Sequence, residues 1–279
     1  MEAKPDPRAV EAEPAAPFYT RYGIARTGDR DAPLAITPYP HVCRAGQLRT
    51  TVLAAAVDIA GSLFTREHAG NDVLFTTDLS VRAPAGTPPK QILVRGRVLR
   101  VGRTGVTTAV ALCDRDAADR AGDEAVWAYG ETTFARVARA EGAVVTAADL
   151  ALPKVFASNP LTRPLEEEVG IRVVDAARGE VELELRRAVL NHERTLQGAL
   201  VALLVERAGE VLGESRLGAP QRITELDLRY LSTAKVGPVR SGAFFVGDPV
   251  QGMLRVELRD AGREDRVTAT AFLRIAPAR

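Results

Sequence analysis

The stretch at residues 194–209 reads RTLQGALVALLVERAG, and an earlier stretch at residues 46–61 reads GQLRTTVLAAAVDIAG. Both begin with a short polar turn and continue as a small-residue apolar run that carries one acidic side chain, Asp58 or Glu206. These two acidic residues are 148 positions apart, and so are Leu48 and Leu196. Two copies at one spacing indicate a duplicated domain rather than a longer repeat array.

The similarity continues downstream of both stretches. Residues 75–79 align with residues 224–228, with Asp78 and Asp227 at a separation of 149. The segments that begin at Leu112 and Leu258 align at a separation of 146. Small differences in loop length between the copies explain this drift.

Each copy has the pattern of one long helix followed by strands. The helices, expected over residues 48–64 and 196–212, are apolar around most of their circumference and must be buried on most sides. Alternating or β-branched runs follow, separated by Pro/Gly turns. These runs lie at 73–81, 92–101, 106–112 and 125–134 in the first copy, and at 223–230, 239–246, 253–258 and 267–275 in the second. A further hairpin, 171–174 with 180–185, precedes the second helix.

This order of elements predicts an α+β fold class. We expect one antiparallel sheet per copy, its four later strands in meander order, wrapped around a single helix. The domain organisation follows from the repeat and the composition. We expect a disordered tail over residues 1–17, a first domain over 18–138, a linker over 139–160 and a second domain over 161–279.

Charge and composition exclude several classes of protein. Lys and Arg total 37 against 36 Asp and Glu, so the net charge of +1 provides no basic surface for nucleic acid or anionic membrane. No apolar run reaches the roughly 18 residues of a membrane span, and no signal-peptide core is visible. Two cysteines and three separated histidines form neither a disulfide framework nor a metal site. We therefore expect a cytoplasmic protein without nucleic-acid, membrane or metal partners.

The start of each helix resembles a motif of the PaaI-like acyl-CoA thioesterases, a branch of the hotdog superfamily. That motif reads roughly Asn-x5-His-Gly-Gly, with an acidic residue nine positions after the His. The residues in this register are Asn191, Gln197, Gly198 and Glu206 in the second copy, and Cys43, Arg49, Thr50 and Asp58 in the first. Gln197 and Arg49 stand where the family has His. The resemblance covers the chain beyond about residue 18 and implies a tandem, or double, hotdog fold, in which each helix is wrapped by a curled antiparallel sheet.

An active site on this fold needs both helices. Gly198 and Glu206 are eight residues apart, which is about 12 Å along one helix. An oxyanion donor and a water-activating carboxylate must both lie near 3 Å from one reacting carbonyl. Two antiparallel helices meet this requirement, and the resemblance implies sites between two hotdog units. One site then combines Asp58 with the start of the second helix, and the other combines Glu206 with Cys43 and Thr50.

The site with Asp58 contains the groups that thioester hydrolysis requires. We expect the N–H of Gly198, at a helix N-terminus, to bind the thioester oxygen. The amide of Asn191 would hold that oxygen or fix the loop, and Asp58 would act as general base on water or attack directly. We expect this site to be functional and the site with Glu206 to have decayed. The alternatives are that the acidic residues are structural acceptors and that Gly198 only permits close packing.

Further residues are assigned to the site from their type and spacing, without a complete motif. Thr76 or Thr77 matches a hydroxyl that orients the water in some relatives, and the hypothesis gives the catalytic role to Thr77 and a substrate-binding role to Thr76. Gln197 and Glu206 are also placed in substrate binding. Arg100 and Arg103 are expected to meet the phosphates of coenzyme A, with a solvated strand face as the alternative. Two histidines that precede the helices, His41 and His192, are less favoured bases.

Three functions remain open at this point. The leading hypothesis is hydrolysis of an acyl-CoA or acyl-carrier-protein thioester, with no cofactor beyond the coenzyme A that belongs to the substrate. The alternatives are a catalytically lapsed hotdog protein that binds acyl thioesters or a partner, and, less favoured, a hotdog dehydratase or hydratase. By analogy, two chains would pair as a homodimer.

Overall fold

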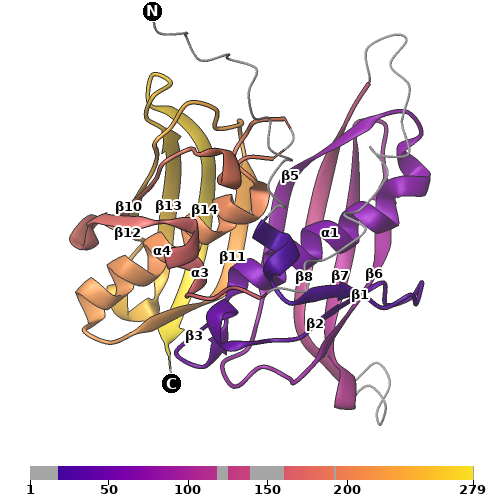
Figure 1. The fold of residues 1–279 in the computed structure, drawn as a ribbon, viewed down its shortest axis with the longest axis horizontal. Coiled ribbons are helices and arrows are strands. Elements are labelled where there is room, and N and C mark those ends of the chain that lie inside the picture. The colour runs from indigo at the N-terminus through magenta and orange to yellow at the C-terminus, as the bar shows by residue number, and fades with distance from the viewer. Residues whose placement is uncertain (1–17, 118–124, 139–159, 192, 279) are drawn as a thin grey trace, which may run out of the picture.

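The computed structural model describes residues 18–117, 125–138, 160–191 and 193–278. The predicted tail over 1–17, nearly all of the predicted linker and His192 lie outside the described residues. Two halves of similar construction stand side by side, each with one long helix against a sheet (Figure 1).

The two long helices are α1 (Thr50–Ala69) and α4 (Gly198–Leu217), each of 20 residues. Both begin after a residue with extended backbone, Arg49 or Gln197, and both are followed by a glycine with positive φ. Gly70 has φ 58° and Gly218 has φ 71°, which suits a residue without a Cβ. The helices extend five residues beyond their expected ends, because they end at these glycines rather than where the apolar pattern stops.

The first half supplies six strands of the main sheet and a small separate pair. The main strands are β1 (Ile24–Arg26), β2 (Leu34–Ile36), β5 (Val73–Arg82), β6 (Ile92–Val101), β7 (Gly105–Asp114) and β8 (Val126–Val137). The separate pair is β3 (Cys43–Arg44) with β4 (Gln47–Leu48). Short 3-10 helices lie at η1 (Phe18–Arg21) and η2 (Pro40–Val42).

The second half repeats this arrangement. Its strands are β9 (Arg172–Asp175), β10 (Glu180–Leu183), β11 (Gln221–Tyr230), β12 (Val239–Phe245), β13 (Met253–Asp260) and β14 (Arg266–Pro277). Its short helices are α3 (Leu165–Val169), η4 (Ala176–Arg178), η5 (Arg187–Val189) and η6 (Pro249–Gln251).

All twelve main strands form one antiparallel sheet, in the order β1-β2-β6-β7-β8-β5-β11-β14-β13-β12-β10-β9. The α+β class is therefore confirmed. The expected meander order is wrong at its first strand, because β5 pairs with β8 rather than β6, and β11 pairs with β14 rather than β12. The connection between β5 and β6, residues 83–91, is long and contains three prolines, so it is not a tight hairpin.

The two halves join where β5 pairs with β11. Ser80 lies opposite Asp227, Leu79 opposite Leu228 and Val81 opposite Leu226. This symmetric register makes positions 79 and 226, and 81 and 228, equivalent at a separation of 147. The bulges of the two strands, between Thr76 and Asp78 and between Ile223 and Glu225, fall at the same separation of 147, so the predicted separation of 149 is wrong here.

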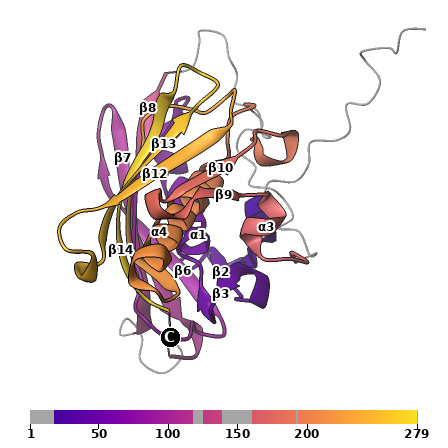
Figure 2. The same ribbon diagram turned by 90° about the vertical axis from the view of Figure 1, so that its left-hand side faces the viewer.

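Both long helices lie on one face of the continuous sheet and contact each other (Figures 1 and 2). Glycines allow each helix to pack closely on the sheet: a Cβ on Gly61 would lie 2.3 Å from Thr132 Cγ2 of β8, and one on Gly209 would lie 2.6 Å from Leu273 Cδ1 of β14. The interior residues of each helix are buried almost throughout. Among the described helices, none combines the length and apolar character that crossing a bilayer requires.

Candidate active site

Asp58 lies in the third turn of α1, half-buried on the side that faces the second half. The hydroxyl of Thr76, on β5, donates a 2.6 Å hydrogen bond to Asp58 Oδ1. Burial raises the pKa of Asp58 above its ordinary value, and the bond from Thr76 lowers it part of the way back. A carboxylate in this state is suited to take up a proton.

Thr77 is directed elsewhere. Its hydroxyl donates to the backbone oxygen of Thr133 on the neighbouring strand, at 3.1 Å. The bulge between Thr76 and Asp78 separates the two threonines, so only Thr76 contacts Asp58. The catalytic role that the sequence hypothesis gave to Thr77 therefore fits Thr76 instead.

The start of α4 is bonded to Tyr230, a residue close enough to Asp58 to be affected by its charge. Tyr230, at the end of β11, donates a 3.2 Å hydrogen bond from its hydroxyl to the backbone oxygen of Gly198. Burial raises the pKa of Tyr230, and the negative charge of Asp58 raises it further. Tyr19 on η1 shows the same two effects. Asp58 thus faces the first turn of α4 across the junction between the halves.

The first two N–H groups of α4 have no hydrogen-bond partner among the described residues. They belong to Gly198 and Ala199, and no side chain caps this end of the helix. Helix N-termini attract negatively charged or partially negative oxygen atoms. Together with Asp58, Thr76 and Tyr230, these two N–H groups form what we call the Asp58 site.

Asn191 and Gln197 fix the loop that leads into α4. Asn191 Oδ1 accepts hydrogen bonds from the N–H of Glu193 and of Thr195, both at 3.0 Å. Gln197 is buried, and its Nε2 donates to the backbone oxygens of Ala188 and Leu190, while its Oε1 accepts from the N–H of Phe18. Of the two roles considered for Asn191, the loop contacts match the second. Gln197 is engaged in the same way, which differs from the expected substrate contact.

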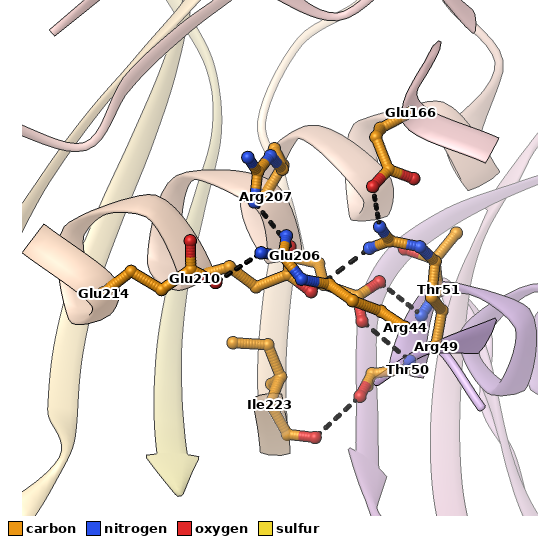
Figure 3. Close-up of polar contacts among 10 residues, drawn as sticks. All are labelled: Arg44, Arg49, Thr50, Thr51, Glu166, Glu206, Arg207, Glu210, Glu214 and Ile223. Atoms are coloured by element: carbon orange, nitrogen blue, oxygen red, sulfur yellow. Dashed lines mark hydrogen bonds and ion pairs between the residues drawn. The ribbon is translucent and has the colours of Figure 1, made fainter. Parts of the chain in front are cut away.

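Glu206 occupies the equivalent place in the second half, but its carboxylate is already bound (Figure 3). Oε1 accepts from the N–H of Thr50 at 2.9 Å, and Oε2 accepts from the N–H of Thr51 at 3.0 Å. Glu206 is only 3% exposed, so these bonds form in a dry environment. The side chain therefore caps the N-terminus of α1, which is the position expected to bind a thioester oxygen. We call this group the Glu206 site.

A buried ionic network surrounds the Glu206 site (Figure 3). Arg49 pairs with Glu166 at 2.6 Å and with Glu210 at 3.1 Å, and Arg44 pairs with Glu210 and Glu214. Burial lowers the pKa of Arg49, but the neighbouring carboxylates outweigh it and keep the guanidinium charged. The cavity left at this place is about 10 Å³, room for no more than a water molecule.

The acidic side chains of the two sites differ in length by one methylene group. Asp58 and Glu206 stand at the same turn of helices that begin 148 residues apart, Gly198 is equivalent to Thr50, and Ala199 to Thr51. The longer Glu206 spans the space to the opposite helix and binds both N–H groups there. The shorter Asp58 makes no bond to α4 among the described residues, so the equivalent N–H groups remain available to another oxygen.

Similar proteins are found by comparison of structures and not by comparison of sequences. No protein-family model matches the sequence, and no curated protein matches it. A solved acyl-ACP thioesterase from Bacteroides thetaiotaomicron is similar, with 15% identity, a TM-score of 0.54, and coverage of 92% of this chain and 99% of the other. An acyl-CoA thioesterase II from Mycobacterium marinum has 13% identity and a TM-score of 0.51, covering 88% of this chain and 92% of its own.

A third structure decides the fold. It is a conserved protein of unknown function with a hot dog fold from Alicyclobacillus acidocaldarius, 12% identical, with a TM-score of 0.56 over 93% of this chain and 97% of the other. The chain has the double hotdog fold. Each hotdog unit contributes one central helix, and the Asp58 and Glu206 sites are the two places where the helix of one unit meets the helix start of the other.

Arg100 and Arg103 lie apart from both sites of the double hotdog. They are exposed at the β6–β7 hairpin, three strands or about 14 Å from β5 in the sheet order. No hydrogen bond or ion pair joins either of them to Asp58 in the described part of the chain. A hollow of about 470 Å³ lies on the sheet face turned away from the helices, and none of the predicted site residues lines it.

Sequence reasoning missed Tyr230, Tyr19 and Ala199. Tyr230 has no counterpart at the Glu206 site, because the equivalent position, 147 residues earlier, is Ala83. The repeat indicates only residues that occur at equivalent positions in both copies, and Tyr230 has no such equivalent. His41 packs edge-on against Tyr39, with ring centroids 6.5 Å apart, away from the acidic residues.

Proposed function

We propose that this protein hydrolyses acyl thioesters of coenzyme A or of an acyl carrier protein at the Asp58 site. One observation carries the proposal: a half-buried carboxylate held by Thr76 faces two helix N–H groups that have no partner in the described part of the chain. A general base and an oxyanion-binding pair are the two elements that acyl transfer to water requires. The similar thioesterases from Bacteroides thetaiotaomicron and Mycobacterium marinum support this choice of reaction.

The proposed reaction proceeds by attack of water. The thioester oxygen accepts hydrogen bonds from the N–H groups of Gly198 and Ala199, which stabilise the negative charge that develops on it. Asp58 takes a proton from water as the water oxygen bonds to the carbonyl carbon. When the tetrahedral intermediate collapses, the carbon–sulfur bond breaks and Asp58 returns the proton to the leaving thiolate. The products are a carboxylic acid and a free thiol.

Other residues keep this geometry in place. Thr76 orients the carboxylate of Asp58, Tyr230 binds the first residue of α4, and Asn191 with Gln197 fixes the loop before it. The reaction needs no cofactor, since coenzyme A or the carrier arm belongs to the substrate. The proposal retains a cytoplasmic location and a homodimer as expectations.

The proposal gives each chain one working site. At the Glu206 site the carboxylate itself occupies the N–H pair, so no thioester oxygen can bind there. Arg49 and Glu210 fill the surrounding space with ion pairs. The sequence led us to expect one functional and one decayed site, and in this proposal the difference arises because Glu206 binds the N–H pair of its own site.

Thiol release tests the proposal. The wild type, Asp58→Asn and Glu206→Gln would be compared on acetyl-, hexanoyl-, palmitoyl- and aryl-CoA with a thiol-trapping reagent. We expect the wild type to release thiol from at least one substrate, and Asp58→Asn to lose about 10²-fold or more in kcat. Glu206→Gln should retain turnover. Equal losses in both variants would contradict the single site, and no release from any substrate, acyl-carrier-protein thioesters included, would contradict the activity.

A further inference from the structure

The sheet face that is turned away from the helices is hollowed where the two halves join. The hollow has a volume of about 470 Å³, and strands β8, β5, β11, β14 and β13 all contribute to its lining. Both long helices lie against the opposite face of the sheet (Figure 2). The hollow is therefore separate from the Asp58 site and the Glu206 site.

One row of side chains crosses the hollow. The strand register places five residues opposite one another on successive strands: Glu131, Ser80, Asp227, Phe272 and Arg255. All five line the hollow, and each lies between two buried residues of its own strand. This alternation shows that their side chains point away from the core. We call these five residues the outer row.

Two opposite charges in the outer row have no ion-pair partner in the described part of the chain. They belong to Glu131 and Arg255, at the two ends of the row. Arg255 lies over the ring of Phe272, 5.1 Å from its centroid, but no described carboxylate pairs with it. Four strand spacings, or about 19 Å, separate the two charges, so they cannot neutralise each other within one chain.

We propose that a second copy of this chain docks on this face, with Glu131 of each copy paired with Arg255 of the other. In a two-fold symmetric dimer every contact between two different residues occurs twice. An axis parallel to the strands and passing over Asp227, the middle of the outer row, brings these two charges together. The same axis places Ser80, a small residue, opposite the half-exposed ring of Phe272. The strands of the two sheets then run nearly parallel to one another, as in aligned sheet packing.

The charges of the hollow favour a second copy over a strongly acidic or basic partner. Asp78 pairs with Arg229 at 3.6 Å, and Asp227 pairs with Arg82 at 2.8 Å. The hollow is thus left with one uncompensated charge of each sign. A second copy related by the two-fold axis presents the same two charges in reverse order and neutralises both.

The face is large enough for a stable interface. The axis superimposes the strands from β7 to β12, which are seven strands and about 29 Å across. The shortest of them, β12, has seven residues and spans about 23 Å. The overlap is roughly 700 Å² per copy, within the range of about 600–1,000 Å² per partner that specific interfaces bury. Phe244, which is 61% exposed and lies next to Arg255 on β12, would be covered by β7 of the other copy.

Sedimentation velocity of charge-reversal variants tests the pairing. We expect the wild type to be a dimer at micromolar concentration. Glu131→Arg and Arg255→Glu each create two like-charged pairs in the dimer, so each should raise the dissociation constant at least about tenfold. The double variant Glu131→Arg/Arg255→Glu restores opposite charges in exchanged order and should return within about threefold of the wild type. Arg216→Glu, exposed on α4, is the matched control and should change nothing.

A second variant tests the same face without changing the charge pair. Phe244→Asp places a charge where the other copy would cover an aromatic ring, so we expect it to raise the dissociation constant at least about tenfold. Val250→Asp, at an 83% exposed apolar residue outside the outer row, is its control. Circular dichroism of every variant checks that the fold is retained.

Three results would overturn the proposal. The first is a wild type that stays monomeric at all concentrations. The second is a dimer that neither Glu131→Arg nor Phe244→Asp weakens, because another face would then form the interface. The third is weakening by both single charge reversals without recovery in the double variant, because the two residues would then not pair. The inference does not rest on the proposed function, since the oligomeric state is measured without substrate.

Discussion

At the scale of single residues, the length of one acidic side chain distinguishes the two sites. Glu206 reaches the N–H groups of Thr50 and Thr51, and Asp58 is held by Thr76 instead. The sequence predicted both acidic residues and their cross-pairing with the opposite helix start. It could not predict that Glu206 binds that helix start itself, because side-chain reach depends on the distance between two helices.

The hydrogen bond from Thr76 lowers the pKa of Asp58, and a pH–rate profile can measure this effect. Burial raises the pKa of Asp58 and the Thr76 hydrogen bond lowers it, so removing that bond raises the pKa further. A general base works in its deprotonated form, so activity falls as the pH drops through this pKa. We expect Thr76→Ala to move the acidic limb of the kcat/KM profile to higher pH and to lower kcat. Thr77→Ala, whose hydroxyl bonds to Thr133, should leave the limb in place; a shift in Thr77→Ala alone would contradict the assignment.

Among the secondary-structure elements, α1 and α4 differ in the hydrogen-bond partners of their first N–H groups. The start of α1 is capped by a carboxylate from the other half, and no described residue caps the start of α4 in this way. A capped terminus stabilises the fold, and an open one is able to bind a ligand. The sequence predicted both helices from their apolar runs, but placed their ends too early, because the terminal turns are polar.

The different N-termini of α1 and α4 predict that Glu206→Gln and Asp58→Asn change stability in opposite directions. Burial raises the pKa of Glu206 as well, but its carboxylate accepts two N–H bonds and is attracted by Arg49. Glutamine at position 206 can accept only one of the two N–H bonds and carries no charge for Arg49, so we expect Glu206→Gln to lower the free energy of unfolding by about 1–3 kcal/mol. The pKa of Asp58 is raised in the folded state, so its contribution to stability is greatest below the ordinary pKa and is lost as the pH rises through the raised one. Asp58→Asn should therefore raise Tm at pH 7. Thermal unfolding at pH 7 checks both, and a lower Tm for Asp58→Asn would contradict this reading.

At the scale of the whole molecule, one sheet passes through both halves. β5 pairs with β11, Arg82 forms a hydrogen-bonded ion pair with Asp227 at 2.8 Å, and α1 contacts α4. The duplication was visible in the sequence, and so was most of the strand content. The order of strands was not, because pairing between β5 and β8 depends on a long connection whose path no local pattern specifies.

This continuity predicts that the two halves unfold together. Trp127, the single tryptophan, belongs to the first half, whereas far-ultraviolet circular dichroism reports both. We expect chemical denaturation followed by tryptophan fluorescence and by circular dichroism to give coincident, single transitions. Two separated transitions would show that the junction at β5 and β11 does not couple the halves.

In the proposed mechanism, the Asp58 site is open because aspartate is one methylene shorter than glutamate. Thiol release by Asp58→Glu tests it most directly, with Asp58→Asn as the inactive reference. The added methylene should let the carboxylate bind the N–H groups of Gly198 and Ala199, as Glu206 binds those of Thr50 and Thr51. We predict that turnover falls to the level of Asp58→Asn while the fold is retained and Tm does not decrease. Turnover close to that of the wild type would show that side-chain length does not decide which site is open.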